Sequence, residues 1–313
     1  MKNRREFLQT ASAATLVTPL LSSTAQLLGA TIQSEPSKCI DAHVHVWGPF
    51  SIDYPLAAGF SEKDMVPPTF TPEELFAHCR PQNVDRIVLI QMNFFGFDNR
   101  YMLDCMAKHK GVFSGVAVID EAKSDAVATM KQLAKKSVRG FRLYANKANA
   151  ASWLNSTGMN AMWNYGADAG LSMCLLSDPD ALGMIDELCA KFPKTPVVID
   201  HFSRIGMKGT VQSADLDALC KLSRFENVHV KTSAFYALGK KKTPYLDLAD
   251  MIRKLRDTFG ANRLMWASDC PYQVQDGHTY EASISLIRDE LDFLTAEDKD
   301  WMLRKTAEKV FFS

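Results

Sequence analysis

Three histidines and one aspartate stand where they could act together in this 313-residue sequence: His43, His45, His201 and Asp269. His43 and His45 are separated by one residue, and His201 and Asp269 directly follow the apolar runs PVVID and RLMWAS. Imidazole and carboxylate groups can hold a divalent ion, and they can also take up and return protons during hydrolysis. Either chemistry requires that the fold bring the four side chains to one place.

The elements that could position these side chains are eight short runs rich in β-branched and other apolar residues. They span residues 39–46, 85–91, 113–119, 138–144, 171–177, 196–200, 227–233 and 263–268. After the first, the runs recur at roughly 25 to 35 residues with amphipathic stretches between them, which indicates parallel βαβ units. Eight such units close most naturally into a barrel. We therefore predict an α/β fold, a single-domain (β/α)8 (TIM) barrel over residues 37–313.

The amphipathic stretches predict the helices of this barrel. One should begin at Thr71–Pro72, where Thr71 is a plausible N-cap and Glu74 completes a capping box. Residues 47–70, which contain several Pro, Gly and aromatic residues, predict an irregular insertion after the first strand. Further helices are predicted over residues 98–109, 121–136, 180–192 and 246–260.

A closed barrel would bring the four candidate residues together. Active-site residues of such barrels lie at the carboxyl ends of the strands. Side chains alternate along a strand, so His43 and His45 should share the face toward the barrel axis. His201 should end the sixth strand and Asp269 the eighth, which becomes the neighbour of the first when the barrel closes. The sequence therefore predicts convergence of all four.

Composition and charge exclude several classes of partner. Lys plus Arg and Asp plus Glu are both 36, so the formal net charge is zero, and no dense basic run favours nucleic acid. Hydrophobic residues make up 47% of the chain, enough for a sizeable core. The seven cysteines are scattered without a C-x-x-C motif, which predicts buried free thiols. The expected partner is a small-molecule substrate.

The first 30 residues predict a twin-arginine-type export signal. Arg4 and Arg5 precede a stretch of modest hydrophobicity that is rich in Ala, Ser, Thr and Leu. Its polar residues and Pro19 make it a poor membrane span. We therefore expect the protein to be exported to the periplasm, without an integral membrane segment after export.

The strand motifs resemble those of the amidohydrolase-related family. The matching segments are IDAHVHVW, VRGFRLY, VVIDHFSRIG, NVHVKTSAFY and RLMWASDCPY, in that order along the chain. Within that family they are most similar to lactonases that act on 2-pyrone-4,6-dicarboxylate and on sugar lactones such as fucono- and rhamnonolactone. The resemblance extends from residue 39 to the end of the chain and implies a TIM-barrel hydrolase that opens a cyclic ester.

The resemblance also implies roles for the four residues. Asp269 would take a proton from water and later return it to the departing oxygen of the opened ring. His43, His45 and His201 would polarise the ester carbonyl and orient the water.

Two metal states are left open. One divalent ion, zinc or manganese, could be held by His43, His45 and Asp269. Metal-dependent relatives usually carry a further ligand, commonly histidine, at the end of the fifth strand. Here that strand reads LSMCLLSD, in which Cys174 is the one soft ligand. Lactonases without that histidine can work without a metal, with protonated histidines as the electrophile.

Substrate contacts are predicted from the strand ends. Arg142, on the fourth strand, stands where the lactonase branch has a substrate-binding arginine, whose planar donors suit carboxylates or ring oxygens. Gln91 and Asn93 from the second strand, Lys231 from the seventh and the aromatic Tyr236 beyond it are further candidates.

Dicarboxylate lactonases carry two more cations that this chain lacks. In those lactonases one cation lies six residues after the arginine that corresponds to Arg142, where this chain has Ala148. The other lies after the seventh strand, where this chain reads TSAFYALG. A neutral or singly charged lactone, such as a sugar lactone, therefore fits better than a dicarboxylate.

Two other functions were weighed against lactone hydrolysis. A non-oxidative decarboxylase on the same barrel would depend on a tightly held metal. The missing ligand on the fifth strand therefore argues against a decarboxylase. A catalytically inactive exported binding protein is the second alternative. The intact set of three imidazoles and one carboxylate argues against that loss of activity.

Overall fold

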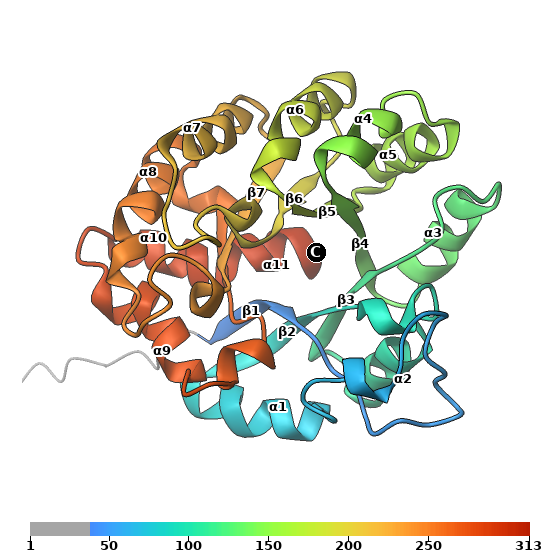
Figure 1. Cartoon of the computed structure of the whole chain (residues 1–313), viewed down its shortest axis with the longest axis horizontal. Helices are drawn as coiled ribbons and strands as arrows, with labels where there is room; N and C mark the ends of the chain where they lie inside the picture. The colour runs from blue at the N-terminus through green and yellow to red at the C-terminus, as the bar shows by residue number, and fades with distance from the viewer. Residues whose placement is uncertain (1–37) are drawn as a thin grey trace, which may run out of the picture. The chain divides into compact units, whose positions relative to one another are not determined.

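The computed structural model describes residues 38–313, which form one closed (β/α)8 barrel. Eight parallel strands follow one another around the sheet in sequence order, and Figure 1 shows the helices arranged around them. The strands are β1 (Cys39–Val44), β2 (Val84–Ile90), β3 (Phe113–Ala117), β4 (Val138–Ala145), β5 (Ser172–Ser177), β6 (Val197–Ile199), β7 (Val228–Ser233) and β8 (Leu264–Ala267). The predicted fold and all eight strands are confirmed.

Backbone hydrogen bonds between the first and last strands close the barrel. The amide of His45 donates to the carbonyl of Cys270 at 2.8 Å, and the amide of Asp269 donates to the carbonyl of His43 at 2.9 Å. A parallel bridge pairs Val44 with Cys270 between these two bonds. The backbones that carry the histidine pair and the aspartate are therefore directly bonded to each other.

Most of the α-helices cover the outside of the barrel, and the last one lies across one end of it. They are α1 (Pro72–Cys79), α2 (Arg100–Lys108), α3 (Ala126–Ala134), α4 (Lys147–Trp153), α5 (Thr157–Ala169), α6 (Leu182–Lys191), α7 (Ser213–Lys221), α8 (Ala249–Phe259), α9 (Tyr280–Ser285), α10 (Ala296–Asp300) and α11 (Thr306–Phe311). The capping box of α1 forms as predicted, with the Thr71 hydroxyl accepting from the amide of Glu74 and the Glu74 carboxylate accepting from the amide of Thr71. Residues 47–70 are irregular, and Trp47 and Phe70 bridge the two ends of this insertion.

Two apolar cores hold the barrel. The larger lies between the strands and the surrounding helices, and a smaller one fills the barrel interior with residues such as Ile40, Val88, Val198 and Met265. Phe311 of α11 joins the inner core, so the last helix fills one end of the barrel. The seven cysteines are buried and form no disulfide bonds, as predicted.

The predicted export signal, residues 1–30, lies outside the residues that the structure describes. Within residues 38–313, none of the helices combines the length and the apolar character that a membrane crossing requires.

Candidate active site

A break in the register of β1 turns the histidine pair into the barrel. Ala42 belongs to the inner core and Val44 to the outer one, so strict alternation from Ala42 would direct His43 and His45 outward. The pairing of β1 with β2 shifts between Asp41 and Val44, which is the signature of a β-bulge. The extra residue reverses the alternation and directs both imidazoles toward the axis.

Asp41 fixes this bulge from the outer side. Its carboxylate accepts hydrogen bonds from the amide of His43 at 3.2 Å, the amide of Ser268 at 2.9 Å and the hydroxyl of Tyr280 at 2.7 Å. These bonds tie the bulge to the end of β8 and to α9. Burial raises the pKa of Asp41 to about 6, although its hydrogen bonds with Ser268 oppose that shift.

Left-handed backbone conformations at His201 and Asp269 set the directions of their side chains. His201 begins a left-handed turn that runs to Arg204, with φ between +51° and +57° at each residue, and Asp269 has a φ of +65°. Such conformations cost about 1–3 kcal/mol at residues other than glycine and persist where surrounding contacts impose them. One such contact is the 2.8 Å hydrogen bond between His201 Nδ1 and the hydroxyl of Ser233.

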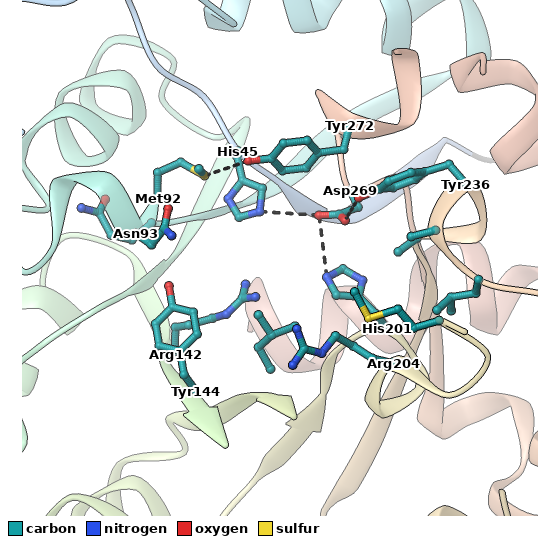
Figure 2. A pocket seen from close by; sticks show the side chains of 16 residues that line it. His45, Met92, Asn93, Arg142, Tyr144, His201, Arg204, Tyr236, Asp269 and Tyr272 are labelled. Carbon is teal, nitrogen blue, oxygen red and sulfur yellow. Dashed lines mark hydrogen bonds and ion pairs between the residues drawn. The ribbon is translucent and has the colours of Figure 1, made fainter. Parts of the chain in front are cut away.

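The four predicted residues converge on one point. The Nε2 atoms of His43 and His45 lie 3.3 Å apart. Asp269 Oδ1 lies 3.5 Å from Nε2 of His43, 3.5 Å from Nε2 of His45 and 3.7 Å from Nε2 of His201. Figure 2 shows His45 and His201 on two sides of the Asp269 carboxylate. One carboxylate oxygen therefore faces three imidazole nitrogens.

A buried charge network lies beneath His43. The Lys231 ammonium is 3.0 Å from the Asp200 carboxylate and 3.2 Å from Nδ1 of His43, and both charged side chains are fully buried. Arg142 Nη1 lies 3.2 Å from Nε2 of His43 and 3.6 Å from Asp200. Burial alone would raise the pKa of Asp200, but Lys231, His43 and Arg142 hold it well below its ordinary value.

The same surroundings keep two of the imidazoles neutral. Burial lowers the pKa of His43 well below its usual value, and the adjacent Lys231 charge lowers it further. Burial also lowers the pKa of His201, although the negative charge of Asp269 opposes this shift. Both shifts favour the neutral form of these two imidazoles.

Tyr236 holds the other oxygen of the aspartate. Its hydroxyl donates to Asp269 Oδ2 at 2.7 Å, and Figure 2 shows its ring beside that carboxylate. Burial would raise the pKa of Asp269, but His201, His45 and His43 hold it below its ordinary value. Asp269 is therefore ionised at neutral pH, with Oδ2 fixed by Tyr236 and Oδ1 facing the imidazoles.

Removal of the Tyr236 hydroxyl should impair turnover more than substrate binding. A hydrogen bond to a charged group contributes about 1.5–3 kcal/mol, so we expect Tyr236→Phe to lower kcat about tenfold or more while KM changes less than twofold. Steady-state kinetics on the best substrate would measure both. Tyr272→Phe is the matched control, because the Tyr272 hydroxyl lines the same cavity but donates to Met92 Sδ at 4.0 Å and not to Asp269. Equal kcat values for both variants would contradict a positioning role for Tyr236.

His45, His201 and Asp269 line a cavity of about 290 Å³. Arg142, Asn93 and Tyr236, which were predicted as substrate contacts, line this cavity. Gln91 also lines it, but its amide donates to the carbonyl of Asp98 at 2.7 Å. Lys231 does not belong to the lining and is fully buried, so the predicted substrate contact is replaced by a role beneath His43.

The histidine pair and Asp269 have the geometry of a metal site. A tetrahedral zinc ion with bonds of 2.0–2.1 Å places its ligand atoms roughly 3.3 Å apart, close to the 3.3–3.5 Å measured here. His45 Nδ1 lies 2.9 Å from the carbonyl oxygen of Ile90, which leaves Nε2 free to bind a cation. His43, His45 and Asp269 therefore fit a divalent ion.

Cys174 is not part of that site. Its side chain is fully buried in the inner apolar core. Burial raises the pKa of its thiol to about 12, so it is not a thiolate at neutral pH. Cys174 therefore packs in the inner core and does not face the histidines.

Sequence reasoning missed three residues of this site. Asp41 and Asp200 stand in the motifs IDAHVHV and VVIDH, each within two residues of a predicted histidine, but both were counted as strand residues. Arg204 lines the cavity at the end of the left-handed turn and pairs with the carboxylate of Asp178. The proximity of acidic residues to the histidines was the signal that could have identified the first two.

Comparisons with known proteins agree with this geometry. A family model described as amidohydrolase matches residues 40–312. An L-fucono-1,5-lactonase of Burkholderia ambifaria is 27% identical over 243 residues, which are 76% of this chain and 82% of that protein. A 4-sulfomuconolactone hydrolase of Rhizobium radiobacter is 24% identical over 237 residues, 76% of this chain and 77% of that protein. The structure of an amidohydrolase from Burkholderia multivorans with bound zinc has a TM-score of 0.72 at 17% identity, covering 88% of this chain and 99% of that one.

Proposed function

This chain belongs to the amidohydrolase family, and from that premise we propose that it opens a small lactone by adding water to the cyclic ester. The observation that carries the proposal is the convergence of one ionised carboxylate and three imidazoles beside a cavity. Both curated relatives described above act on lactones. A cavity of about 290 Å³ suits a compound with one small ring.

Asp269 is the general base of the proposed reaction. A water bound beside Oδ1 would donate one proton to this oxygen, and the neighbouring imidazoles would orient the water toward the ester carbonyl. Tyr236 keeps Oδ2 occupied, so the proton is directed to Oδ1. After attack, the proton on Asp269 passes to the departing ring oxygen, and the product is a hydroxy acid.

Arg142 is the fixed cation nearest to the site of attack. Its guanidinium is 5% exposed, lines the cavity and lies beside Nε2 of His43. A guanidinium can donate to the carbonyl oxygen as negative charge develops there. It supplies a positive charge even though His43 and His201 are neutral at neutral pH.

We also propose that His43, His45 and Asp269 hold one divalent ion, zinc or manganese. Such an ion would polarise the ester carbonyl and lower the pKa of a bound water. The second nitrogen of His43 lies 3.4 Å from the Asp200 carboxylate, an outer contact that commonly supports a metal-bound imidazole.

Zinc retention tests this metal proposal without an activity assay. Protein dialysed with Zn²⁺ and then freed of excess ion should retain about one equivalent, and His45→Ala should retain almost none, because one of three ligands is lost. His78→Ala, which removes an exposed histidine on α1, is the control for adventitious binding and should match the parent. Equal zinc in parent and His45→Ala protein would rule out this site.

A lactone panel tests the proposed activity itself. Acid release from aldono-, alkyl- and muconolactones would be followed by pH-stat, and we expect hydrolysis of at least one of them. Release of CO2 from aromatic carboxylates, followed in parallel, would favour the decarboxylase alternative. Absence of both reactions, with lactone binding retained, would favour the inactive binding protein.

We further propose that residues 1–30 direct export to the periplasm through the twin-arginine route, on the basis of Arg4 and Arg5. Cell fractionation of the parent and of the Arg4→Lys/Arg5→Lys variant tests this. Equal distribution of the two proteins would contradict it.

A further inference from the structure

We propose that the substrate of this lactonase carries an apolar chain or ring, and that a second cavity beside the active cavity binds this group. This inference rests on the proposed lactone hydrolysis and names the class of lactone. It departs from the sugar lactone expected from the sequence.

Outside the proposed catalytic cluster of His43, His45, His201 and Asp269, three polar side chains of the active cavity already have partners, and Asn93, Arg142, Tyr144 and Tyr272 line it as well. The amide of Gln91 donates to a backbone carbonyl, the Tyr236 hydroxyl donates to the base, and Arg204 pairs with a carboxylate. Aliphatic side chains make much of the remaining wall: Met92, Leu176, Met207, Ala234, Ala237 and Leu238. Because buried hydroxyl groups need hydrogen-bond partners, this wall suits an apolar body better than a polyhydroxylated ring.

The second cavity, which we call the side cavity, adjoins the active cavity. Asn93, Arg142 and Tyr144 line both, so these three residues form the boundary between them. Figure 2 shows these three residues on the side of the active cavity opposite Tyr236. The side cavity has a volume of about 490 Å³, larger than the 290 Å³ around the catalytic cluster. A group attached to the lactone ring on the side away from Asp269 would extend toward it.

The side cavity has an apolar floor. Its buried apolar side chains are Val118, Ile119, Leu143 and Trp153, each exposed by 8% or less. Apart from Arg142, which is buried at the boundary with the active cavity, the polar side chains that line it, such as Ser152, are exposed or half-buried. An alkyl or aryl group that binds here would therefore be removed from water and pack against apolar side chains, while the polar rim of the cavity stays solvated.

This arrangement predicts a dependence on chain length. Each methylene buried in the side cavity should tighten binding about threefold to fourfold, the effect expected from the transfer of a methylene out of water. The dependence should stop when the cavity is full.

Two homologous series separate binding from turnover. The probes are γ-butyrolactones with γ-alkyl groups from methyl to hexyl, and the matching 5-alkyl-2-pyrrolidinones, whose amide bond resists hydrolysis. Lactam affinity would be measured by calorimetry and lactone kcat/KM by pH-stat. Ser152→Phe fills the cavity from α4 and Ala122→Phe fills it from the loop after β3, because both residues are exposed and line it. Ser152→Ala is the control that removes the hydroxyl without filling.

We expect lactam affinity and lactone kcat/KM to rise with chain length in the parent and in Ser152→Ala. Either filling variant should reduce both the lactam affinity and the lactone kcat/KM for the hexyl compound at least tenfold. For the methyl compound, both quantities should stay within twofold of the parent. The side-cavity proposal would be overturned if lactone kcat/KM did not depend on chain length, or if it were unchanged in Ser152→Phe and Ala122→Phe. Lactam affinity that rises with chain length, in a protein that hydrolyses none of the lactones, would support the side cavity and count against the hydrolase proposal.

Discussion

Replacement of Asp269 by asparagine is expected to lower kcat/KM for lactone hydrolysis by about 10²–10⁴-fold, the range lost when a positioned proton acceptor is removed. Asparagine has the same shape and can still accept the hydrogen bond from Tyr236, but its amide cannot take a proton from water at neutral pH. The pH-stat assay with the best lactone of the panel measures this loss directly.

The matched control is Asp276→Asn, which changes an exposed aspartate in the loop that follows β8. That variant should keep the parental kcat/KM within twofold. The urea midpoint of unfolding of both variants should lie close to that of the parent. If Asp269→Asn kept parental activity, the base would be another group and the proposed mechanism would be wrong.

The second large effect is expected from the buried pair of Lys231 and Asp200. Removal of one partner leaves the other charge without compensation in the interior, which typically costs about 3–5 kcal/mol of unfolding free energy. We expect losses of this size in both Lys231→Met and Asp200→Asn. The double variant should lose less than the sum, because neither charge is left alone.

Urea unfolding followed by circular dichroism gives all three free energies. The exposed pair of Lys254 and Asp217 provides the comparison, since its side chains are 43% and 58% exposed. Lys254→Met should change the unfolding free energy by less than about 1 kcal/mol. Additive losses in the double variant of the buried pair would show that Lys231 and Asp200 do not stabilise each other.

The sequence was a good guide to the barrel because its strands are nearly continuous apolar runs. Strands buried on both faces read as such runs, and each of the eight predicted runs overlaps a strand of the structure, with ends that differ by no more than two residues. Helix ends were predicted less well: the stretch 121–136 contains α3 over Ala126–Ala134, because its first residues form turns. The convergence of strands 1, 6 and 8 followed from barrel closure alone.

Local backbone irregularities could not be predicted in this way. The alternation rule placed His43 and His45 on one face, which is correct, but it gives no sign of the bulge that turns this face inward. Likewise, nothing in the types of His201 and its neighbours predicts four consecutive left-handed residues. Both features depend on contacts from distant strands and loops, such as Asp41 with Ser268 and His201 with Ser233.

The sequence also did not predict how deep a side chain lies inside the barrel. Lys231 was predicted to point inward, and it does, but it lies beneath His43 rather than along the cavity. Its partner follows from the register, because Ile199 pairs with Val230, which places Asp200 next to Lys231. The sequence contains no direct signal of the register between two parallel strands.

A single-turnover reaction in H₂¹⁸O tests most directly whether Asp269 activates water or attacks the lactone itself. Excess enzyme would be mixed with its best lactone, and mass spectrometry would follow the product acid and the peptide that carries Asp269. If water attacks, the first product acid gains one ¹⁸O atom and the peptide mass is unchanged. An unlabelled first product, together with one ¹⁸O atom in the Asp269 peptide after the same turnover, would show that the carboxylate is the nucleophile and would contradict the account.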